Sequence, residues 1–251
     1  MSRPSSTPRA GCGHATGPEI GVVSIYPALL GTYGDGGNVL VLRHRARLRG
    51  LHLRVTEVNP GDPVPRTADI YVLGGGEDTA QVAAADYLRT DGALSAAADR
   101  GAAILAICAG YQLLGERFPD AQGNPVPGVG ILDISTDRLP RRAVGEIVCR
   151  PDNPAVPGVT DLITGYENHA GATHLGPAAA PLGRTLHGVG NGDGAEGAVQ
   201  GRVIGTYAHG PALARNPQLA DQLLSWAVGR VLEPIDEPEV TALRKERLTT
   251  V

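Results

Sequence analysis

The apolar positions of the first half of the chain fall in short unbroken runs separated by longer mixed stretches. The apolar runs predict buried strands, and the mixed stretches have the period of helices. The expected strands lie at 20–27, 51–58, 68–78 and 102–107, and the expected helices at 39–50, 79–101 and 110–118. Strands that alternate with helices predict a single α/β domain with a doubly wound, mostly parallel sheet of the flavodoxin-like type.

The pattern changes after residue 119, where turns and short β segments replace the long helices. Segments such as "AVGEIVCRP" and "GYENHAG" predict short strands or hairpins added to the sheet, and "GRVIGTYAHG" predicts a late strand that ends on a histidine. A helix is expected from Pro217, with Asn216 as its N-cap. We divide the chain into a disordered leader at 1–16, one domain at 17–232 and a charged C-terminal tail at 233–251.

Composition narrows the class of protein. Aromatic residues make up 4% of the chain, so the core must consist of Ala, Val, Leu and Ile, as in a parallel sheet covered by helices. The net charge of −4 and the lack of a basic cluster with interleaved aromatics argue against nucleic-acid binding. The densest basic stretch, "RHRARLRG" at 43–50, is interpreted as the solvated face of a helix, with a docking surface for an acidic partner as the alternative.

Cysteine usage and hydropathy bear on the location of the protein. Three cysteines stand far apart, at positions 12, 108 and 149, and neither C-x-x-C nor H-E-x-x-H occurs. This pattern predicts neither a disulfide framework nor a metal site, and it favours a reducing compartment. No apolar run approaches the length of about 18 residues that a membrane span needs, and the N-terminus lacks the apolar core of a secretory signal. We therefore expect a cytoplasmic protein with no transmembrane segment.

Cys108 lies at the junction of a buried strand and a helix, in "LAICAGYQLLG". Small residues on both sides are typical of a tight strand–nucleophile–helix turn. Such a turn presents the side chain at the carboxyl edge of the sheet, and the first N–H groups of the helix favour a thiolate. We therefore predict that Cys108 is a nucleophile, with a buried inert cysteine as the alternative.

An attacking thiolate needs donors for the oxyanion that it creates. The N–H of Ala109, directly after Cys108, is one predicted donor. Gly75 or Gly76, in the "VLGGGED" stretch that follows a strand, is the second, because glycines allow close approach of the backbone.

A cysteine nucleophile also needs a base, and histidine is the usual one. Among the seven histidines, His209 directly follows a clear parallel-type strand, "RVIGTYA", so it is expected at the same sheet edge as Cys108. His169, in the β segments, is the alternative.

These motifs resemble a known family. "LAICAGYQLLG", "LGGGED" and "GTYAHGP" together are similar to the class I glutamine amidotransferases, and the His-Gly-Pro ending is similar to the branch that contains cobyric acid synthases. Most class I enzymes carry a Glu two residues after the histidine, whereas Pro211 stands there in this chain. "TYGDGGNVLVLRHRARLRG" and "GYENHAGATHLG" extend the resemblance, over residues 20 to 232, to the glutaminase subunits of lipid II isoglutaminyl synthases.

The resemblance implies L-glutamine as the substrate and roles for further residues. Asp35 in "YGDGGN" matches the aspartate suspected as the third catalytic member, which would orient His209, and Glu167 in "YENH" is a rival acid. The arginine that contacts the glutamine carboxylate matches Arg142, although two more arginines, at 138 and 141, lie close by.

The resemblance also implies a partner. The chain contains no G-x-x-x-x-G-K-[ST] motif, yet amidation of a carboxylate requires activation, normally by ATP. The implied arrangement is a heterodimer in which this chain holds no cofactor. A Mur-ligase-like subunit would bind ATP and Mg²⁺ and activate the α-carboxylate of D-glutamate in the lipid II stem peptide.

Three other functions remain open at this stage. An amidotransferase of a cobyrinic- or cobyric-acid-type pathway is the first, although such chains usually carry a fused ATP-binding domain for which 251 residues leave no room. A cysteine hydrolase of another small amide is the second. A catalytically idle binding module on the same sheet is the third, and the intact elbow with His209 argues against it.

Overall fold

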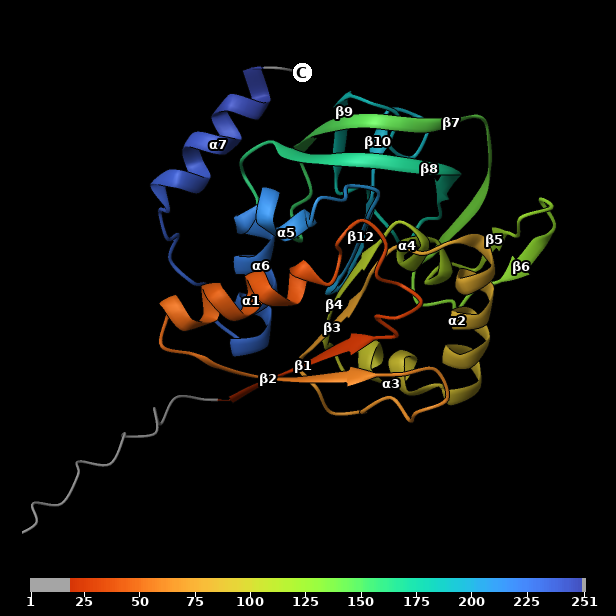
Figure 1. Ribbon diagram of the computed structural model, residues 1–251, viewed down its shortest axis with the longest axis horizontal. Helices are drawn as coiled ribbons and strands as arrows, with labels where there is room; N and C mark the ends of the chain where they lie inside the picture. The colour runs from red at the N-terminus through yellow and green to blue at the C-terminus, as the bar shows by residue number, and fades with distance from the viewer. Residues whose placement is uncertain (1–18, 250–251) are drawn as a thin grey trace, which may run out of the picture.

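The main sheet of the protein has the strand order β11-β12-β4-β3-β1-β2 in the computed structural model, which describes residues 19–249 (Figure 1). Neighbouring strands are parallel except for β11 and β12, which are antiparallel. The strands are β1 (Glu19–Ile25), β2 (His52–Val58), β3 (Ile70–Leu73), β4 (Ala103–Ile107), β11 (Ala198–Gln200) and β12 (Val203–Thr206). The parallel part, β2-β1-β3-β4-β12, has the flavodoxin-like order, which confirms the predicted fold class.

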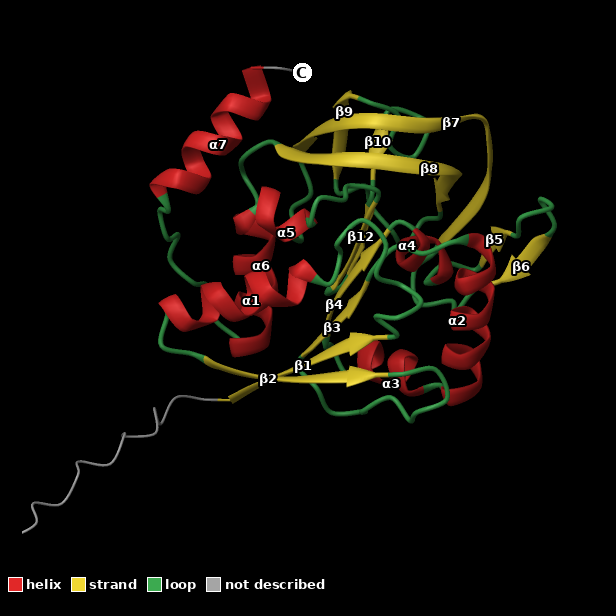
Figure 2. Cartoon of the chain, in the orientation of Figure 1, coloured by secondary structure: helices red, strands yellow, loops and turns green. Residues whose placement is uncertain are grey.

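Helices cover both faces of this sheet, with α1 and α6 on one face and α2, α3 and α4 on the other (Figures 1 and 2). They are α1 (Gly37–Leu48), α2 (Asp78–Asp91), α3 (Ala93–Asp99), α4 (Ala109–Leu113), α5 (Ala212–Arg215), α6 (Pro217–Val228) and α7 (Pro238–Thr249). The helix expected at 79–101 is two helices, because Gly92 takes a left-handed φ of 65° between them. The helix expected at 110–118 is shorter, because the chain enters another strand at Arg117.

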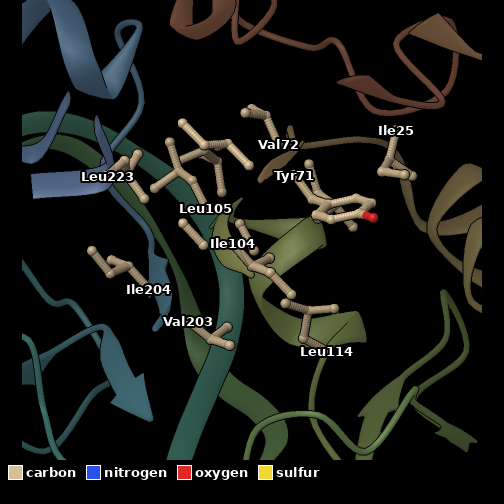
Figure 3. Close-up of a cluster of buried hydrophobic side chains, with 14 of the residues drawn as sticks. Ile25, Tyr71, Val72, Ile104, Leu105, Leu114, Val203, Ile204 and Leu223 are labelled. Atoms are coloured by element: carbon tan, nitrogen blue, oxygen red, sulfur yellow. The ribbon is translucent and has the colours of Figure 1, made fainter. Parts of the chain in front are cut away.

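The core lies around the central strands. Every residue of β3 and β4 is buried, because helices cover both faces of these strands. Figure 3 shows the aliphatic side chains that fill this region, among them Ile104, Leu105 and Ile204. Unbroken apolar runs at these strands therefore reflect burial on both faces.

The β segments between residues 117 and 196 form a second sheet, in the order β10-β9-β7-β5-β6, with β8 paired to β7. Its strands are β5 (Arg117–Pro119), β6 (Pro125–Pro127), β7 (Ile134–Pro151), β8 (Ile163–Leu175), β9 (Gly183–His187) and β10 (Ala195–Glu196). Four of these strands are short, as expected, but β7 has 18 residues and β8 has 13. These strands form a separate sheet instead of extending the main one, and all its pairings are antiparallel except that of β5 with β7. An isolated bridge between Tyr166 and His209 joins β8 to the carboxyl end of β12.

The basic stretch on α1 is exposed at Arg43, His44 and Arg47, as expected for a solvated face, but Arg45 is an exception. Arg45 is 2% exposed and binds both carboxylate oxygens of Asp221 on α6, at 2.6 and 2.7 Å. Its guanidinium also bonds Glu237, which precedes α7. A buried arginine persists only when carboxylates pair with it, so this residue fastens α1 to α6 and to the C-terminal segment.

The two terminal segments differ in how much of each the structure describes. The predicted leader at 1–16 lies outside the described residues. Most of the predicted charged tail is described and contains α7, in which no residue is buried. Within the described part of the chain, no helix is both long and apolar enough to cross a membrane.

Candidate active site

Cys108 lies between β4 and α4 with φ 51° and ψ −105°. A positive φ in a residue other than glycine is strained, and surrounding packing must maintain it. The packing here is close, because a Cβ on Gly110 would lie 2.8 Å from the carbonyl oxygen of Gly74. The small residues around Cys108 are therefore required by the tight turn, as the sequence predicts.

The other described cysteine has a different environment. Cys149 is buried in β7, and burial raises the pKa of its thiol far above the ordinary value. Cys108 lines a pocket instead. Of the two described cysteines, Cys108 is therefore the one that a ligand in the pocket can reach.

His209 and Asp35 form a buried pair beside this cysteine. Nδ1 of His209 lies 3.0 Å from Oδ2 of Asp35, and each residue is 1% exposed. A Cβ on Gly75 would lie 2.7 Å from Cε1 of His209, 3.3 Å from Oδ2 of Asp35 and 3.4 Å from Cβ of Cys108. The three side chains therefore converge on one glycine, whose missing side chain leaves room for them.

The charge state of His209 follows from these neighbours. Burial alone would lower the pKa of the imidazole, but the hydrogen bond to Asp35 and the interaction with the Cys108 thiol raise it to about 10. Nε2 is buried and has no hydrogen-bond partner among the described residues. Since Asp35 holds Nδ1, the imidazole has Nε2 left for a proton exchange with the thiol or with a substrate.

The two glycines proposed for the oxyanion are not equivalent. The N–H of Gly75 donates to Oδ2 of Asp35 at 2.8 Å, so it is already used. Gly76 lines the same pocket as Cys108 and Ala109. Among the two glycines, the structure therefore leaves Gly76 as the donor that can act beside Ala109, and Gly75 acts by giving space and by holding Asp35.

The rival residues, Glu167 and His169, contact each other rather than the His209 side chain, although His169 also lines the pocket of Cys108. Glu167 accepts from the N–H groups of Val189 and Gly190 at 2.7 and 2.9 Å, and its Oε2 lies 3.3 Å from Nε2 of His169. Burial would raise the pKa of Glu167, but these hydrogen bonds lower it. The ring of His169 stacks on Tyr207 at 3.6 Å. Glu167 thus supports the second sheet, and Asp35 is the carboxylate that contacts His209.

A pocket of about 350 Å³ opens beside Cys108. Arg142 and Arg138 line it, whereas Arg141 does not. Arg142 donates from Nε to Oδ1 of Asn168 at 2.6 Å. The pocket therefore brings the Cys108 thiol together with guanidinium groups, which bind carboxylates well.

Sequence reasoning missed several polar residues of this pocket. Gln81 on α2 donates to Oε1 of Gln112 on α4 at 2.9 Å, and Gln112 donates to the Tyr207 hydroxyl at 3.1 Å. Asn168 also lines the pocket, and its Nδ2 donates to the hydroxyl of Tyr33. The sequence signal for Gln112, Asn168 and Tyr33 is that each lies within a motif that resembles the family. Their hydrogen-bond partners come from distant segments, so the sequence does not show those contacts. Among residues 19–249, no group of three or more His, Cys, Asp or Glu side chains is arranged to hold a metal ion.

The chain is similar to known glutamine amidotransferases in both sequence and fold. Residues 21–217 match the CobB/CobQ-like glutamine amidotransferase domain. The chain is 35% identical to the lipid II isoglutaminyl synthase (glutamine-hydrolyzing) subunit GatD of Staphylococcus aureus (strain N315), over 88% of this chain and 90% of that protein. It is 38% identical to cobyric acid synthase of Sphingopyxis alaskensis, over 67% of this chain and 33% of that protein. A crystal structure of a glutamine amidotransferase has the same fold, with a TM-score of 0.56, 19% identity and coverage of 82% of this chain and 98% of that one.

Proposed function

Because this chain belongs to the family of CobB/CobQ-like glutamine amidotransferase domains, we propose that it releases ammonia from L-glutamine through a thioester on Cys108. The ammonia serves a cytoplasmic ligase subunit that amidates the α-carboxylate of D-glutamate in the stem peptide of lipid II. The observation that carries this proposal is the convergence of Cys108, His209 and Asp35 at a pocket that also contains Arg142.

The first half of the reaction forms the thioester. The Cys108 thiolate attacks the side-chain amide carbon of glutamine, and the oxyanion that forms accepts hydrogen bonds from the N–H groups of Ala109 and Gly76. His209 donates its Nε2 proton to the departing nitrogen, the C–N bond breaks, and ammonia leaves. A raised pKa supports this role, because it keeps the imidazole protonated at neutral pH.

The second half regenerates the enzyme. His209, which has lost its proton, removes a proton from water, and the hydroxide attacks the thioester carbon. The C–S bond breaks, and L-glutamate and the Cys108 thiolate are released. Asp35 holds Nδ1 throughout, so that Nε2 always faces the reacting atoms.

Substrate binding falls to the arginines of β7. Arg142 receives the α-carboxylate of glutamine, because its guanidinium lines the pocket that begins at Cys108. Arg138 is a second cation in the same pocket, but its Nη2 lies 3.8 Å from the carboxylate of Asp78, whereas the hydrogen bonds of Arg142 go to the uncharged Asn168. Arg142 is therefore our choice for the carboxylate contact.

The acceptor half of the reaction requires the partner. Lipid II amidation is favoured over a cobyric-acid-type reaction because the chain spans 90% of the lipid II relative and only 33% of the cobyric acid synthase. In this proposal the partner binds ATP and Mg²⁺ and presents an acyl phosphate to the ammonia. This chain contributes the ammonia and meets lipid II through the partner.

Ammonia release from L-glutamine tests the proposal. The wild type, Cys108→Ala and His209→Ala are compared alone and with a co-expressed ATP-dependent ligase subunit, and lipid II amidation is followed by mass spectrometry. We expect losses of more than about 1000-fold for Cys108→Ala and about 100-fold for His209→Ala. Cys149→Ala is the matched control and keeps its activity. An absence of glutamine turnover in the wild type under both conditions contradicts the proposal.

A further inference from the structure

Asn168, on β8, contacts three residues that come from three different segments of the chain. Its carbonyl oxygen lies 4.0 Å from Sγ of Cys108 and accepts from Nη2 of Arg142 at 3.3 Å. Its side-chain Oδ1 accepts from Nε of Arg142 at 2.6 Å. Its Nδ2 donates to the hydroxyl of Tyr33, which precedes α1. One residue therefore touches both the proposed nucleophile and the proposed carboxylate-binding arginine.

Arg142 needs such support because of its place in β7. The pairing of β7 with β8 is interrupted between Arg138 and Ala143, and the register shifts there. A bulge of this kind re-aims side chains and leaves their strand without regular pairing. Arg142 is exposed, and a long exposed side chain loses considerable rotamer freedom when it is fixed in one orientation. The two hydrogen bonds that Arg142 donates to Asn168 fix that orientation, while Nη1 remains for a ligand.

Tyr33 in turn fixes the Asn168 amide. Its backbone has a φ of 59°, an unusual value for a tyrosine, and its ring lies 5.0 Å from the ring of His209. The hydroxyl accepts from Nδ2 of Asn168, which directs Oδ1 of the same amide toward Arg142. Tyr33, Asn168 and Arg142 therefore form a continuous series of contacts that begins beside His209 and ends at a guanidinium that lines the pocket.

We propose that Asn168 is a positioning residue that holds Arg142 at a fixed separation from Cys108 and thereby sets the affinity for the substrate carboxylate. This inference rests on the proposed glutaminase function. A substrate that reacts at its side-chain amide and is held by its α-carboxylate must span that separation. Asn168 acts through Arg142 and touches no reacting bond, so its loss weakens binding equally in the ground state and the transition state.

Steady-state glutamine hydrolysis by the complex tests the inference. We expect Asn168→Ala to raise KM for L-glutamine about 10-fold, with kcat within about 3-fold of the wild type. Tyr33→Phe keeps the ring near His209 and removes only the hydroxyl, so a smaller increase in KM, of about 2- to 5-fold, is expected. Asn59→Ala, on an exposed loop away from the pocket, is the control and leaves both constants unchanged.

A double-mutant cycle separates positioning from a general structural effect. In the Arg142→Ala background, Asn168→Ala adds less than 2-fold to KM, because the group that it positions is gone. L-Glutaminamide, which lacks the α-carboxylate, is hydrolysed at equal rates by the wild type and Asn168→Ala. Urea unfolding midpoints report whether each variant is folded. If Asn168→Ala does not fold, the KM of Tyr33→Phe tests the positioning role instead.

The outcomes distinguish the two proposals. A wild type that hydrolyses glutamine while Asn168→Ala loses kcat at unchanged KM overturns the positioning role alone. Additive effects of Asn168→Ala and Arg142→Ala do the same. A wild-type complex that does not hydrolyse glutamine overturns the proposed function and this inference together.

Discussion

Asp35 joins two parts of the candidate site through one oxygen atom. Its Oδ2 accepts from the N–H of Gly75 and lies 3.0 Å from Nδ1 of His209. The carboxylate therefore fixes both the glycine turn and the orientation of the imidazole. It is also one cause of the raised pKa of His209.

The role of Asp35 can be tested by an isosteric change. The side chain in Asp35→Asn has nearly the same size but no charge. It therefore no longer offers an anionic oxygen to the N–H of Gly75 and to Nδ1 of His209. We expect kcat for glutamine hydrolysis to fall by about 100-fold or more. The pH profile should also shift toward lower pH, because a lost anion lowers the pKa of His209.

Glu167→Gln provides the matched comparison for that experiment. Glu167 contacts His169 and two backbone N–H groups rather than His209, so kcat should stay within about 10-fold of the wild type. If Glu167→Gln lost as much activity as Asp35→Asn, the assignment of the orienting role to Asp35 would be contradicted.

Gly75 is expected to tolerate no side chain. The added methyl group of Gly75→Ala would lie 2.7 Å from Cε1 of His209, which is closer than carbon atoms approach. The imidazole must then shift, and a shift of this kind is expected to reduce kcat by about 100-fold. Gly36→Ala is the control, since its φ is −55° and its Cβ would meet no atom within 4 Å. Comparable kcat losses in the two variants would contradict this reading of the glycine.

At the scale of elements, Asn216 shows how a cap position can serve another purpose. It precedes α6 and Pro217 as predicted, but its side chain makes no capping hydrogen bond. Its Oδ1 accepts from the N–H of Thr164 at 2.8 Å, and its Nδ2 donates to the carbonyl oxygens of Thr164 and Ala212, each at 2.8 Å. This fully buried amide joins β8 to the turn between α5 and α6.

Asn216→Ser separates these two roles. Serine caps helices as well as asparagine does, so a capping role predicts little change. A bridging role predicts a loss of about 2–4 kcal/mol in the free energy of unfolding, because serine cannot reach both groups of Thr164. Urea denaturation measures the difference, with Asn59→Ser as the control. A change below about 0.5 kcal/mol would argue for the cap.

At the scale of the whole molecule, Glu196 links the two sheets from a fully buried position. Its Oε1 accepts from the hydroxyl of Thr206 and from the N–H of Tyr207 at 2.9 Å, at the end of β12. Burial raises the pKa of this carboxyl to about 7, although these hydrogen bonds oppose the shift. The folded protein therefore binds a proton that the unfolded chain releases at lower pH.

The stability of the whole fold should depend on pH through this group. Since the folded pKa lies above the unfolded value of 4.5, the contribution to stability is fully present below about pH 4.5 and is lost as pH rises through about 7. A shift of this size corresponds to about 3 kcal/mol. We expect Glu196→Gln to be more stable than the wild type at pH 8, and the difference to vanish toward pH 5.

Urea unfolding of both proteins between pH 5 and pH 8 measures this difference. Glu57→Gln, an exposed change on β2, should leave the free energy of unfolding nearly unchanged across the range. A difference between Glu196→Gln and the wild type that stays constant with pH would show that Glu196 does not titrate in this interval.

The sequence by itself determined the parallel strands of the main sheet, the alternation of these strands with helices, and the place of Cys108. These features depend on local chemistry: strands buried on both faces require unbroken apolar runs, and a tight turn after β4 requires small residues beside the cysteine. The position of His209 directly after β12 likewise predicts that it lies at the same sheet edge as Cys108. The second sheet was less predictable, because the alternation in β7 and β8 does not state which sheet they join.

Only the tertiary structure decided which polar groups meet. Asp35 lies 174 positions from His209, and the local patterns around Asp35 and Glu167 do not rank them as its partner. The burial of Arg45 against Asp221 and the bridge made by Asn216 depend in the same way on how α1, α6 and β8 pack. Hydrophobic period and turn chemistry are properties of neighbouring residues, whereas a hydrogen bond between distant segments exists only once packing has brought them together.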